Sequence, residues 1–158
     1  MQRSIERYSE SDKNLIEKLG ENLHDNYEFL LDEFSDCIVC RENDTIVGFI
    51  TYSVIYERAE IIDIYVDDKY RRNKIGSILL EEVIKKIRNN NCENVTLEVN
   101  IENKNAIKFY ESFGFKKEHI RKNYYKDSDA YLMKLDLRWY YEGYIHICYR
   151  NKLWWDKL

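Results

Sequence analysis

The chain has 158 residues, of which 44% are hydrophobic and 34% are charged, a balance typical of a single globular domain. A domain of this size removes roughly 70% of its unfolded surface from water, so it needs neither disulfides nor a structural metal to form a core. The longest apolar runs, such as Ile61 to Ile64, are far shorter than the roughly 20 residues that cross a bilayer, which excludes a transmembrane helix. Residues 1–7 mix acids with bases and precede no apolar stretch, so we expect no signal peptide and a cytoplasmic location.

Net charge and cysteine usage narrow the classes of partner and site. The formal net charge is -4, and Lys and Arg are spread along the chain, so we expect neither nucleic acid nor a membrane as a partner. Cys37 and Cys40 have the spacing of a metal or redox pair, but their segment reads as a strand, which turns the two side chains to opposite faces. That placement favours core or edge cysteines over zinc or redox chemistry. The histidines, His24, His119 and His146, are scattered, and no metal site is predicted.

Hydrophobic periodicity and turn-forming residues divide the first half of the chain, which has no proline to mark boundaries. After a first strand, residues 11–14 can cap a helix, and a second short helix is expected to follow. The apolar positions are Leu15, Ile16, Leu19 and Leu23 in the first helix and Tyr27, Leu30, Leu31 and Phe34 in the second. Cys37 to Arg41 and Thr45 to Tyr56 then read as two strands joined by a hairpin turn at residues 42–44. The run Glu60 to Val66 predicts a central strand covered on both faces.

The second half alternates helices with strands. Its most regular pattern predicts a helix with one apolar stripe, formed by Ile75, Ile78, Leu79, Val83, Ile84 and Ile87. A strand over Asn94 to Val99 follows, and then a helix that Asn103 opens and Gly114 closes. Phe115 to Tyr124 and Ala130 to Leu137 are expected to form a last hairpin. This order of elements predicts an α/β fold, with a mixed sheet built largely of hairpins and two crossover helices.

Residues 138–158 differ from the rest of the chain because tryptophans and tyrosines crowd into them. These aromatic residues are Trp139, Tyr140, Tyr141, Tyr144, Tyr149, Trp154 and Trp155. Left in water they would form a large apolar patch. We therefore divide the chain into a domain over residues 1–137 and an extension over 138–158. The extension is expected to pack either on the domain or on a partner subunit, and a homodimer through it is the alternative.

A basic segment, Arg71-Arg72-Asn73-Lys74-Ile75-Gly76-Ser77, lies between the strand that ends at Val66 and the long helix. The first N–H groups of a helix have no partner inside it, and the helix dipole adds positive potential, so the place suits an anion. Gly76 would let the backbone approach a phosphate closely. From these residues alone, a phosphate site and an exposed, capped start of a helix explain the pattern equally well.

The basic segment resembles the pyrophosphate loop of the GNAT superfamily of N-acetyltransferases. The segment Asn103 to Phe115, with the sequence NKNAIKFYESFGF, resembles that family's second acetyl-CoA motif, and two matches in this order are highly specific. One position departs from the pattern, because Lys74 stands where the family has its first loop glycine. The resemblance implies a mixed, mostly antiparallel central sheet of about seven strands flanked by about four helices.

The resemblance also implies acetyl-CoA as the co-substrate, without a metal. The residues that it places at the cofactor are Ile64, Tyr65, Val66, Arg71, Arg72, Asn73, Lys74, Ile75, Gly76, Ser77, Asn103 and Asn105. Within this set, the loop from Arg72 to Ser77 would hold the diphosphate, and Asn103 the pantetheine or adenosine end.

Further matches narrow the class of amine that the resemblance implies as the acetyl acceptor. Leu97-Glu98-Val99 and the segment Asn123 to Leu137 resemble the enzymes that acetylate protein α-amino groups, among them the bacterial ribosomal-protein alanine N-acetyltransferases. Residues 23–27, LHDNY, resemble a loop of the archaeal and eukaryotic catalytic subunits that touches the peptide N-terminus. The resemblance therefore implies acetylation of a protein N-terminus by direct attack in a ternary complex. It places Tyr27, Tyr124 and Tyr125 against the peptide.

Acetyl transfer needs a neutral nitrogen, a polarised carbonyl and a proton for the departing thiolate. Glu98 is a carboxylate in an otherwise apolar strand, where burial would favour proton uptake; a Glu on the wet face of a half-exposed strand is the alternative. By resemblance, Glu98 serves as the base and the Tyr110 hydroxyl faces the sulfur of coenzyme A, with core packing as the alternative for Tyr110. The backbone N–H of Val66 would polarise the carbonyl.

Two other functions fit the same residues. A fold alone names no substrate, so an acetyltransferase that acts on a small amine, such as a polyamine, an antibiotic or an amino acid, is the first alternative. A non-catalytic module that binds coenzyme A is the second. The preference for a protein N-terminus rests partly on acidity, because an α-amino group has a pKa near 8 while a lysine side chain has one near 10.4.

Overall fold

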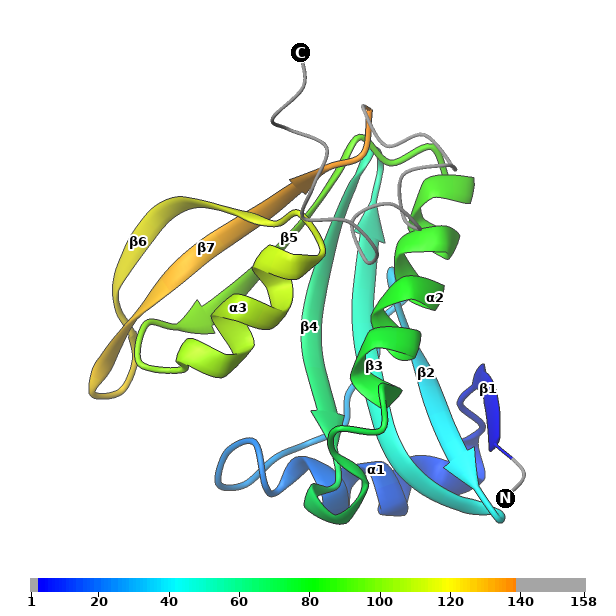
Figure 1. The fold of residues 1–158 in the computed structure, drawn as a ribbon. Helices are drawn as coiled ribbons and strands as arrows, with labels where there is room; N and C mark the ends of the chain where they lie inside the picture. The colour runs from blue at the N-terminus through cyan, green and yellow to red at the C-terminus, as the bar shows by residue number, and fades with distance from the viewer. Residues whose placement is uncertain (1–2, 139–158) are drawn as a thin grey trace, which may run out of the picture. The chain divides into compact units, whose positions relative to one another are not determined.

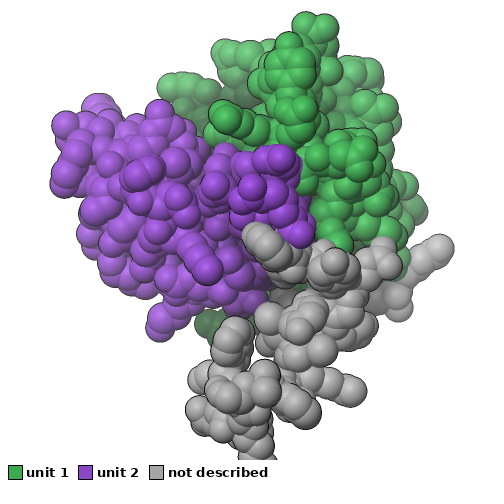
Figure 2. All heavy atoms as spheres, turned by 90° about the horizontal axis from the view of Figure 1, so that it is seen from above, with its two compact units in different colours: residues 1–92 green, residues 93–158 purple. Residues whose placement is uncertain are grey.

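The computed structural model describes residues 3–138, which contain seven strands, three α-helices and two short 3-10 helices (Figure 1). The chain divides into two compact units, one that ends at Cys92 and a second that begins at Glu93 (Figure 2). The predicted α/β class with seven strands is confirmed, whereas the expectation of about four helices exceeds the three α-helices of the described range.

Unit 1 contains four strands and two α-helices. In chain order they are β1 (Arg3–Arg7), η1 (Glu10–Asp12), α1 (Lys13–Gly20), β2 (Ser35–Glu42), β3 (Thr45–Ile55), β4 (Arg58–Val66), η2 (Asp68–Tyr70) and α2 (Ile75–Asn89). The strands lie in the order β1-β2-β3-β4, and each pairs antiparallel with its neighbour. The hairpin predicted at residues 42–44 is confirmed, with Asn43 and Asp44 at positive φ, as tight hairpin turns require.

Helix α2 covers one face of the β2–β3–β4 sheet (Figure 1). Its predicted apolar stripe is confirmed at Ile75, Leu79, Val83, Ile84 and Ile87, which are buried, whereas Ile78 is only partly buried. Gly48 of β3 lies beneath its first turn, where an added Cβ would stand 3.3 Å from Ile75 Cγ2 and 2.8 Å from the Tyr65 carbonyl oxygen. Glycine therefore lets the start of α2 pack directly against the sheet.

The opposite face of the same sheet carries a second cluster. Ile16 of α1 packs there with Val39 of β2 and Phe49 of β3, and Tyr27 and Phe29 close the cluster. Cys37 of β2 belongs to this cluster. Cys40, also on β2, pairs with Gly48 of β3, which faces α2. The prediction that the two cysteines face opposite ways is therefore confirmed, and both are free and buried.

The second short helix predicted through Tyr27, Leu30, Leu31 and Phe34 is wrong, because residues 21–34 form turns and irregular chain. Asn26 has a φ of 56°, which breaks a right-handed helix. Beyond it the burial alternates, with Tyr27 and Phe29 in the core and Leu30 71% exposed. Spacing alone suggested a helix, but the core selects every second side chain of this segment.

The prediction for the Glu60 to Val66 strand is correct in position and wrong in burial. The strand β4 is present, but Ile62 is 49% exposed whereas Ile61 is 3% exposed. The register explains this, since Asp63 pairs with Thr51 and Ile61 with Tyr52, which leaves Ile62 as an extra residue in a β-bulge. A bulged residue has no partner opposite it, so its side chain is not forced into either layer.

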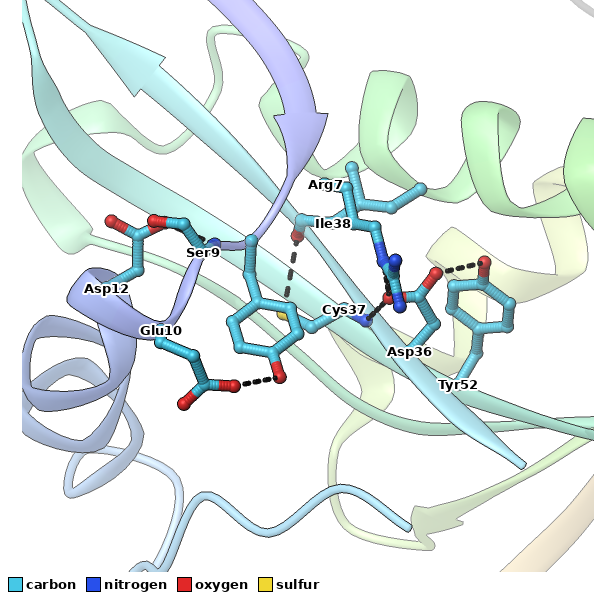
Figure 3. A network of polar contacts seen from close by, with 9 residues as sticks. Arg7, Ser9, Glu10, Asp12, Asp36, Cys37, Ile38 and Tyr52 are labelled. Carbon is cyan, nitrogen blue, oxygen red and sulfur yellow. Dashed lines mark hydrogen bonds and ion pairs between the residues drawn. The ribbon is translucent and has the colours of Figure 1, made fainter. Parts of the chain in front are cut away.

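Strand β1 is tied to the sheet by ion pairs. Figure 3 shows Asp36 of β2 accepting hydrogen bonds from Arg7 Nε at 2.8 Å and from the Tyr52 hydroxyl at 3.5 Å. Burial, and then the Asp36 charge, raises the pKa of Tyr52 to about 12. At the other end of β1, Arg3 pairs with Glu42 at 3.2 Å. The short, exposed first strand is thus held by charge as well as by its backbone ladder.

Unit 2 consists of β5 (Asn94–Asn100), α3 (Lys104–Ser112), β6 (Lys116–Tyr125) and β7 (Ser128–Asp136). The order is β5-β7-β6 with antiparallel pairing, so the last two strands form the predicted hairpin. The predicted ends of α3 are confirmed: the Asn103 side chain accepts a hydrogen bond from Ala106 N–H at 3.1 Å, and Gly114 has a φ of 89°. The aromatic extension predicted over 138–158 lies, apart from Arg138, outside the described residues.

Candidate functional site

The predicted site residues fall into two groups, one in each unit. Unit 1 holds Tyr27, Ile64, Tyr65, Val66, Arg71, Arg72, Asn73, Lys74, Ile75, Gly76 and Ser77, and unit 2 holds Glu98, Asn103, Asn105, Tyr110, Tyr124 and Tyr125. Each group is built from adjacent elements of its own unit, so each has a geometry of its own.

Strand β4 directs alternate backbone N–H groups to opposite edges. The N–H of Asp63 donates to Thr51 Oγ1 at 3.0 Å, and that of Asp67 donates to the Val47 carbonyl at 3.0 Å, so both point toward β3. By alternation, the N–H groups of Ile64 and Val66 point away from β3. The role predicted for Val66 needs an amide that β3 does not use, and this strand provides two.

The loop from β4 to α2 has the backbone form of an anion site. Arg72 and Lys74 adopt left-handed conformations with φ of 64° and 62°, and Lys74 is the N-cap of α2. The chain thus accepts at Lys74 a conformation that glycine favours, at a cost of about 1 to 2 kcal/mol. The N–H groups of Ile75, Gly76 and Ser77 occupy the first turn, where a helix offers them no partner. They can donate to a phosphate, and the helix dipole favours its charge.

The Arg71 side chain contacts its own loop and strand, although its charge suggested a contact with phosphate. Its Nε donates to the Val66 carbonyl at 3.1 Å, its Nη2 pairs with Asp68 at 2.6 Å, and its guanidinium lies 5.7 Å from the centre of the Tyr65 ring. Arg71 therefore braces the loop against the end of β4. The side chains of Arg72 and Lys74 are exposed and form no ion pair within residues 3–138.

Tyr27 is only 7% exposed and packs in the core cluster rather than on the surface. Its ring lies against Gly20 of α1 and 5.0 Å from the His24 ring, centre to centre. Its hydroxyl donates to Asp63 Oδ2 at 3.1 Å, and burial raises the pKa of that hydroxyl. A peptide would therefore contact only the small exposed part of Tyr27, whose ring and hydroxyl are already held in place by other residues.

Asp63 is a site candidate that the sequence analysis missed. It interrupts the apolar run of β4 just as Glu98 interrupts β5, so the same signal was present. Its side chain accepts hydrogen bonds from Tyr27 and, at 3.5 Å, from Thr51 Oγ1. Burial raises the pKa of Asp63, and the hydrogen bond from Tyr27 partly offsets that rise.

Glu98 lies on β5 opposite Leu132 of β7, and its side chain is 7% exposed. The expected burial is therefore present, but the carboxylate also forms an ion pair with Arg121 of β6. The guanidinium of Arg121 lies 4.8 Å from the centre of the Tyr124 ring. One arginine thus contacts both the predicted base and a predicted peptide contact, a link that no sequence pattern on β6 indicated.

Tyr110 is 7% exposed on α3 and packs edge-on against Phe115, with ring centres 5.8 Å apart. The packing that was its alternative explanation is therefore real. A packed ring with a small exposed part is also what a fixed proton donor needs, because the ring then has one orientation.

Tyr124 and Tyr125 lie at the end of β6, where the hairpin departs from regular pairing. The register shifts between Arg121 and Tyr125, and Asn123 has a φ of 53° while its N–H donates to Asp129 Oδ1 at 3.0 Å. This irregularity presents both rings at the surface, 44% and 37% exposed, in an edge-to-face pair with centres 5.1 Å apart.

The side chains of Asn103 and Asn105 differ in whether they already hold a helix cap or lie exposed where a ligand can reach them. The side-chain oxygen of Asn103 caps α3 by accepting the Ala106 N–H, while Asn105, in the first turn of the helix, is exposed. Residues 3–138 contain no group of three or more side chains that could hold a metal ion. Within the same range, no helix combines the length and the apolar character that crossing a bilayer requires.

Comparisons with known proteins agree on one family. The model of the acetyltransferase (GNAT) family matches residues 3–115. The ribosomal protein bS18 alanine N-acetyltransferase of Escherichia coli K12 is 35% identical over 89 residues, which cover 56% of this chain and 60% of that protein. Human N-alpha-acetyltransferase 30 is 35% identical over 108 residues, which cover 65% of this chain and 30% of that protein. The chain thus spans less than two thirds of the length of these curated relatives.

The crystal structure of the ribosomal-protein-S18-alanine N-acetyltransferase from Escherichia coli has the same fold. It superposes with a TM-score of 0.79 at 25% sequence identity and covers 90% of this chain and 98% of its own. The shared fold extends over both units, whereas the family model ends at residue 115.

Proposed function

The chain belongs to the acetyltransferase (GNAT) family, and from that premise we propose that it transfers an acetyl group from acetyl-CoA to the α-amino group of a protein N-terminus. Two relatives whose names state that chemistry, the bacterial bS18 alanine enzyme and human N-alpha-acetyltransferase 30, support the choice of acceptor. The reaction is a direct attack of the amine on the thioester in a ternary complex.

One observation carries the proposal: β4 and the loop that follows it join backbone donors that β3 does not use with donors that have no partner inside helix α2. The N–H groups of Ile64 and Val66 point away from β3, and those of Ile75, Gly76 and Ser77 stand at the start of α2. A coenzyme A thioester presents a carbonyl at one end and a diphosphate at the other. Donors of the first kind suit the carbonyl and donors of the second suit the diphosphate.

The remaining cofactor contacts come from exposed side chains. Arg72 and Lys74 add charge beside the diphosphate, and Asn105 is exposed on the first turn of α3. Asn103 contributes mainly by holding the start of α3, because its side-chain oxygen already accepts the Ala106 N–H. Arg71 contributes by bracing the loop.

Glu98 is the base in this proposal and acts through water on the attacking amine. Its ion pair with Arg121 holds the carboxylate in place. Tyr110 donates a proton or a hydrogen bond to the leaving thiolate, a transfer that is only slightly uphill from a phenol near pKa 10 to a thiolate whose acid is near 8.5.

The acceptor peptide lies along Tyr124 and Tyr125, which the β6–β7 hairpin presents at the surface, with Tyr27 as a further contact. In this proposal residues 1–137 are the acetyltransferase domain, and the aromatic-rich residues 138–158 lie beyond it in sequence. The enzyme works in the cytoplasm, where nascent N-termini and acetyl-CoA meet.

A screen of acceptors with labelled acetyl-CoA tests the proposal. Peptides with a free N-terminal amine should be acetylated, and spermidine or free amino acids should not. Acetylation of spermidine without acetylation of any peptide would instead identify a small-amine acetyltransferase.

Two substitutions test the catalytic assignments. Glu98→Gln and Tyr110→Phe should each lower kcat by about 100-fold or more, the usual contribution of a general acid or base. Calorimetry should show acetyl-CoA binding to both variants within about twofold of the wild type, because neither residue holds the cofactor. Glu118→Gln, the same change at an exposed position of β6, is the matched control. Retention of turnover in both site variants would refute the assignments.

A further inference from the structure

In the described part of the chain, neutral hydroxyl groups rather than a Lys or Arg hold the carboxylate of Asp63. It forms no ion pair with Lys or Arg within residues 3–138, although it is half-buried. Its hydrogen-bond donors are the neutral hydroxyls of Tyr27 and Thr51. By contrast, the half-buried Asp36 in the same unit pairs with Arg7.

An unpaired carboxylate in such a place lowers the stability of the fold. Burial disfavours its ionised form and raises its pKa, and a hydroxyl donor compensates only in part. Proteins keep such a group where a ligand supplies the missing charge. Within residues 3–138 only His24 offers Asp63 a favourable charge, so a ligand ammonium group would add the permanent positive partner that no Lys or Arg of this range supplies.

The surroundings of Asp63 favour a cation over any other ligand. The titratable groups that face it are Tyr27 and His24 from the α1–β2 segment and Cys37 from β2, and Glu17 of α1 adds negative charge near Tyr27. The charge of His24 favours the ionised form of Asp63, but none of the four is a Lys or Arg with a permanent positive charge. An ammonium group would find a carboxylate there, beside the hydroxyl oxygen of Tyr27.

The position along the strand connects this carboxylate to acetyl transfer. Asp63 directly precedes Ile64, one of the two residues whose N–H groups point away from β3. Its partner Tyr27 is the residue of the LHDNY segment assigned to the acceptor peptide. The carboxylate thus lies between a proposed contact of the thioester and a proposed contact of the acceptor.

We propose that Asp63 is the anionic subsite that binds the α-ammonium group of the acceptor before the amine loses its proton. The inference rests on the proposed function and deepens it, because it names the group that selects a charged amine. With a pKa near 8, an α-amino group is mostly protonated at pH 7, so the acceptor arrives as a cation. Asp63 holds this cation, and the proton leaves in the later step assigned to Glu98.

The test measures binding rather than turnover. A short peptide that begins with alanine is titrated by calorimetry at pH 7 in the presence of coenzyme A, and so is the same peptide with its N-terminus acetylated. The wild type should prefer the free amine by about tenfold or more, the size expected for a charge-assisted contact of about 1.4 kcal/mol. Asp63→Asn should lose this preference to within about twofold. Asp44→Asn, the same change in the exposed β2–β3 turn, should keep it.

A second variant separates binding from packing. Tyr27→Phe removes the hydroxyl that donates to Asp63 and leaves the carboxylate in place, so it should keep the preference for the free amine. Loss of the preference in Tyr27→Phe as well as in Asp63→Asn would show that Asp63 acts only by anchoring Tyr27, and would overturn the proposal. Equal binding of both peptides by the wild type would overturn it as well.

Kinetics distinguish the failure of this inference from failure of the proposed function. In Asp63→Asn the KM for the peptide should rise by about tenfold, while the KM for acetyl-CoA stays unchanged. A wild type that acetylates peptides while Asp63→Asn shows no change in peptide KM contradicts only the role of Asp63. A wild type that acetylates no amine contradicts the proposed function itself.

Discussion

Single residues in this fold are constrained by contacts that their type does not reveal, and Gly20 is the clearest case. A Cβ at this position would stand 2.1 Å from Tyr27 Cδ1, and the Tyr27 ring is buried and cannot move aside. Alanine in place of glycine normally favours a helix by about 1 kcal/mol, but overpacking costs about 1 to 3 kcal/mol. We expect Gly20→Ala to lower the free energy of unfolding by up to about 2 kcal/mol in urea titrations. Lys18→Ala, on the exposed side of α1, should change it by less than about 0.5 kcal/mol.

Asp63 gives a prediction about pH at the same scale. Because folding raises its pKa, the folded state binds the Asp63 proton more tightly than the unfolded state does. This carboxyl therefore stabilises the fold fully below its ordinary value of 3.8 and loses that contribution as pH rises through the raised value. Asp63→Asn should be more stable than the wild type at pH 7, and the difference should shrink as the pH falls toward 4. Urea unfolding at a series of pH values measures this, and a difference independent of pH would contradict it.

Single site residues could be predicted where a charged residue interrupts an apolar strand. A charge inside an apolar strand singled out Glu98, and the structure does bury that side chain. The same signal at Asp63 was present but went unused, because no resemblance pointed to it. The partner of Glu98 could not be foreseen, since Arg121 is one of several cations on β6 and only the pairing of β6 with β7 brings it to β5.

At the scale of elements, the start of α3 depends on one side chain. The Asn103 oxygen accepts the Ala106 N–H at 3.1 Å, one of the donors that a helix start leaves unpaired. Asn103→Ala should lower the free energy of unfolding by about 1 kcal/mol. Asn105→Ala, two residues later on the exposed surface, should leave it within about 0.5 kcal/mol. Urea titrations of the two variants provide the comparison, and equal losses would show that the cap contributes nothing specific.

Helices and turns whose signals lie in neighbouring residues of the chain were predicted correctly. The α2 stripe, the Asn43-Asp44 turn and the Asn103 and Gly114 ends of α3 each follow from neighbours in the chain. The segment over residues 21–34 was predicted wrongly because its apolar residues fit helical spacing while the chain that packs on the core is irregular. Local spacing loses there to long-range packing against Gly20 and Asp63.

At the scale of the whole molecule, unit 1 joins its first strand, first helix and sheet through Arg41. This side chain pairs with Asp12 at 2.6 Å and with Glu6 of β1. Burial alone would raise the pKa of Asp12, but hydrogen bonds from Arg41 and Ser9 keep it below its usual range. Arg41→Met should lower the free energy of unfolding by about 3 kcal/mol, because it leaves a buried carboxylate unpaired.

A double-mutant cycle checks this origin. Asp12→Asn removes the stranded charge, so adding it to Arg41→Met should recover part of the lost stability. Additive losses in the double variant would show that the two side chains do not act as a pair. Arg58→Met, at the exposed start of β4, is the matched control and should have little effect.

The amino-acid sequence by itself determined the class of fold, most element boundaries and the family, because hydrophobic period, caps and a contiguous phosphate-loop motif are local properties of a chain. Only the tertiary structure decided that Ile62 bulges from β4, that Tyr27 is buried on Asp63 and that Glu98 meets Arg121. These features depend on register and on pairs of residues far apart in sequence. Which groups surround the Asp63 carboxylate likewise depends on tertiary contacts, and for that reason the proposed ammonium subsite could be found only from the fold.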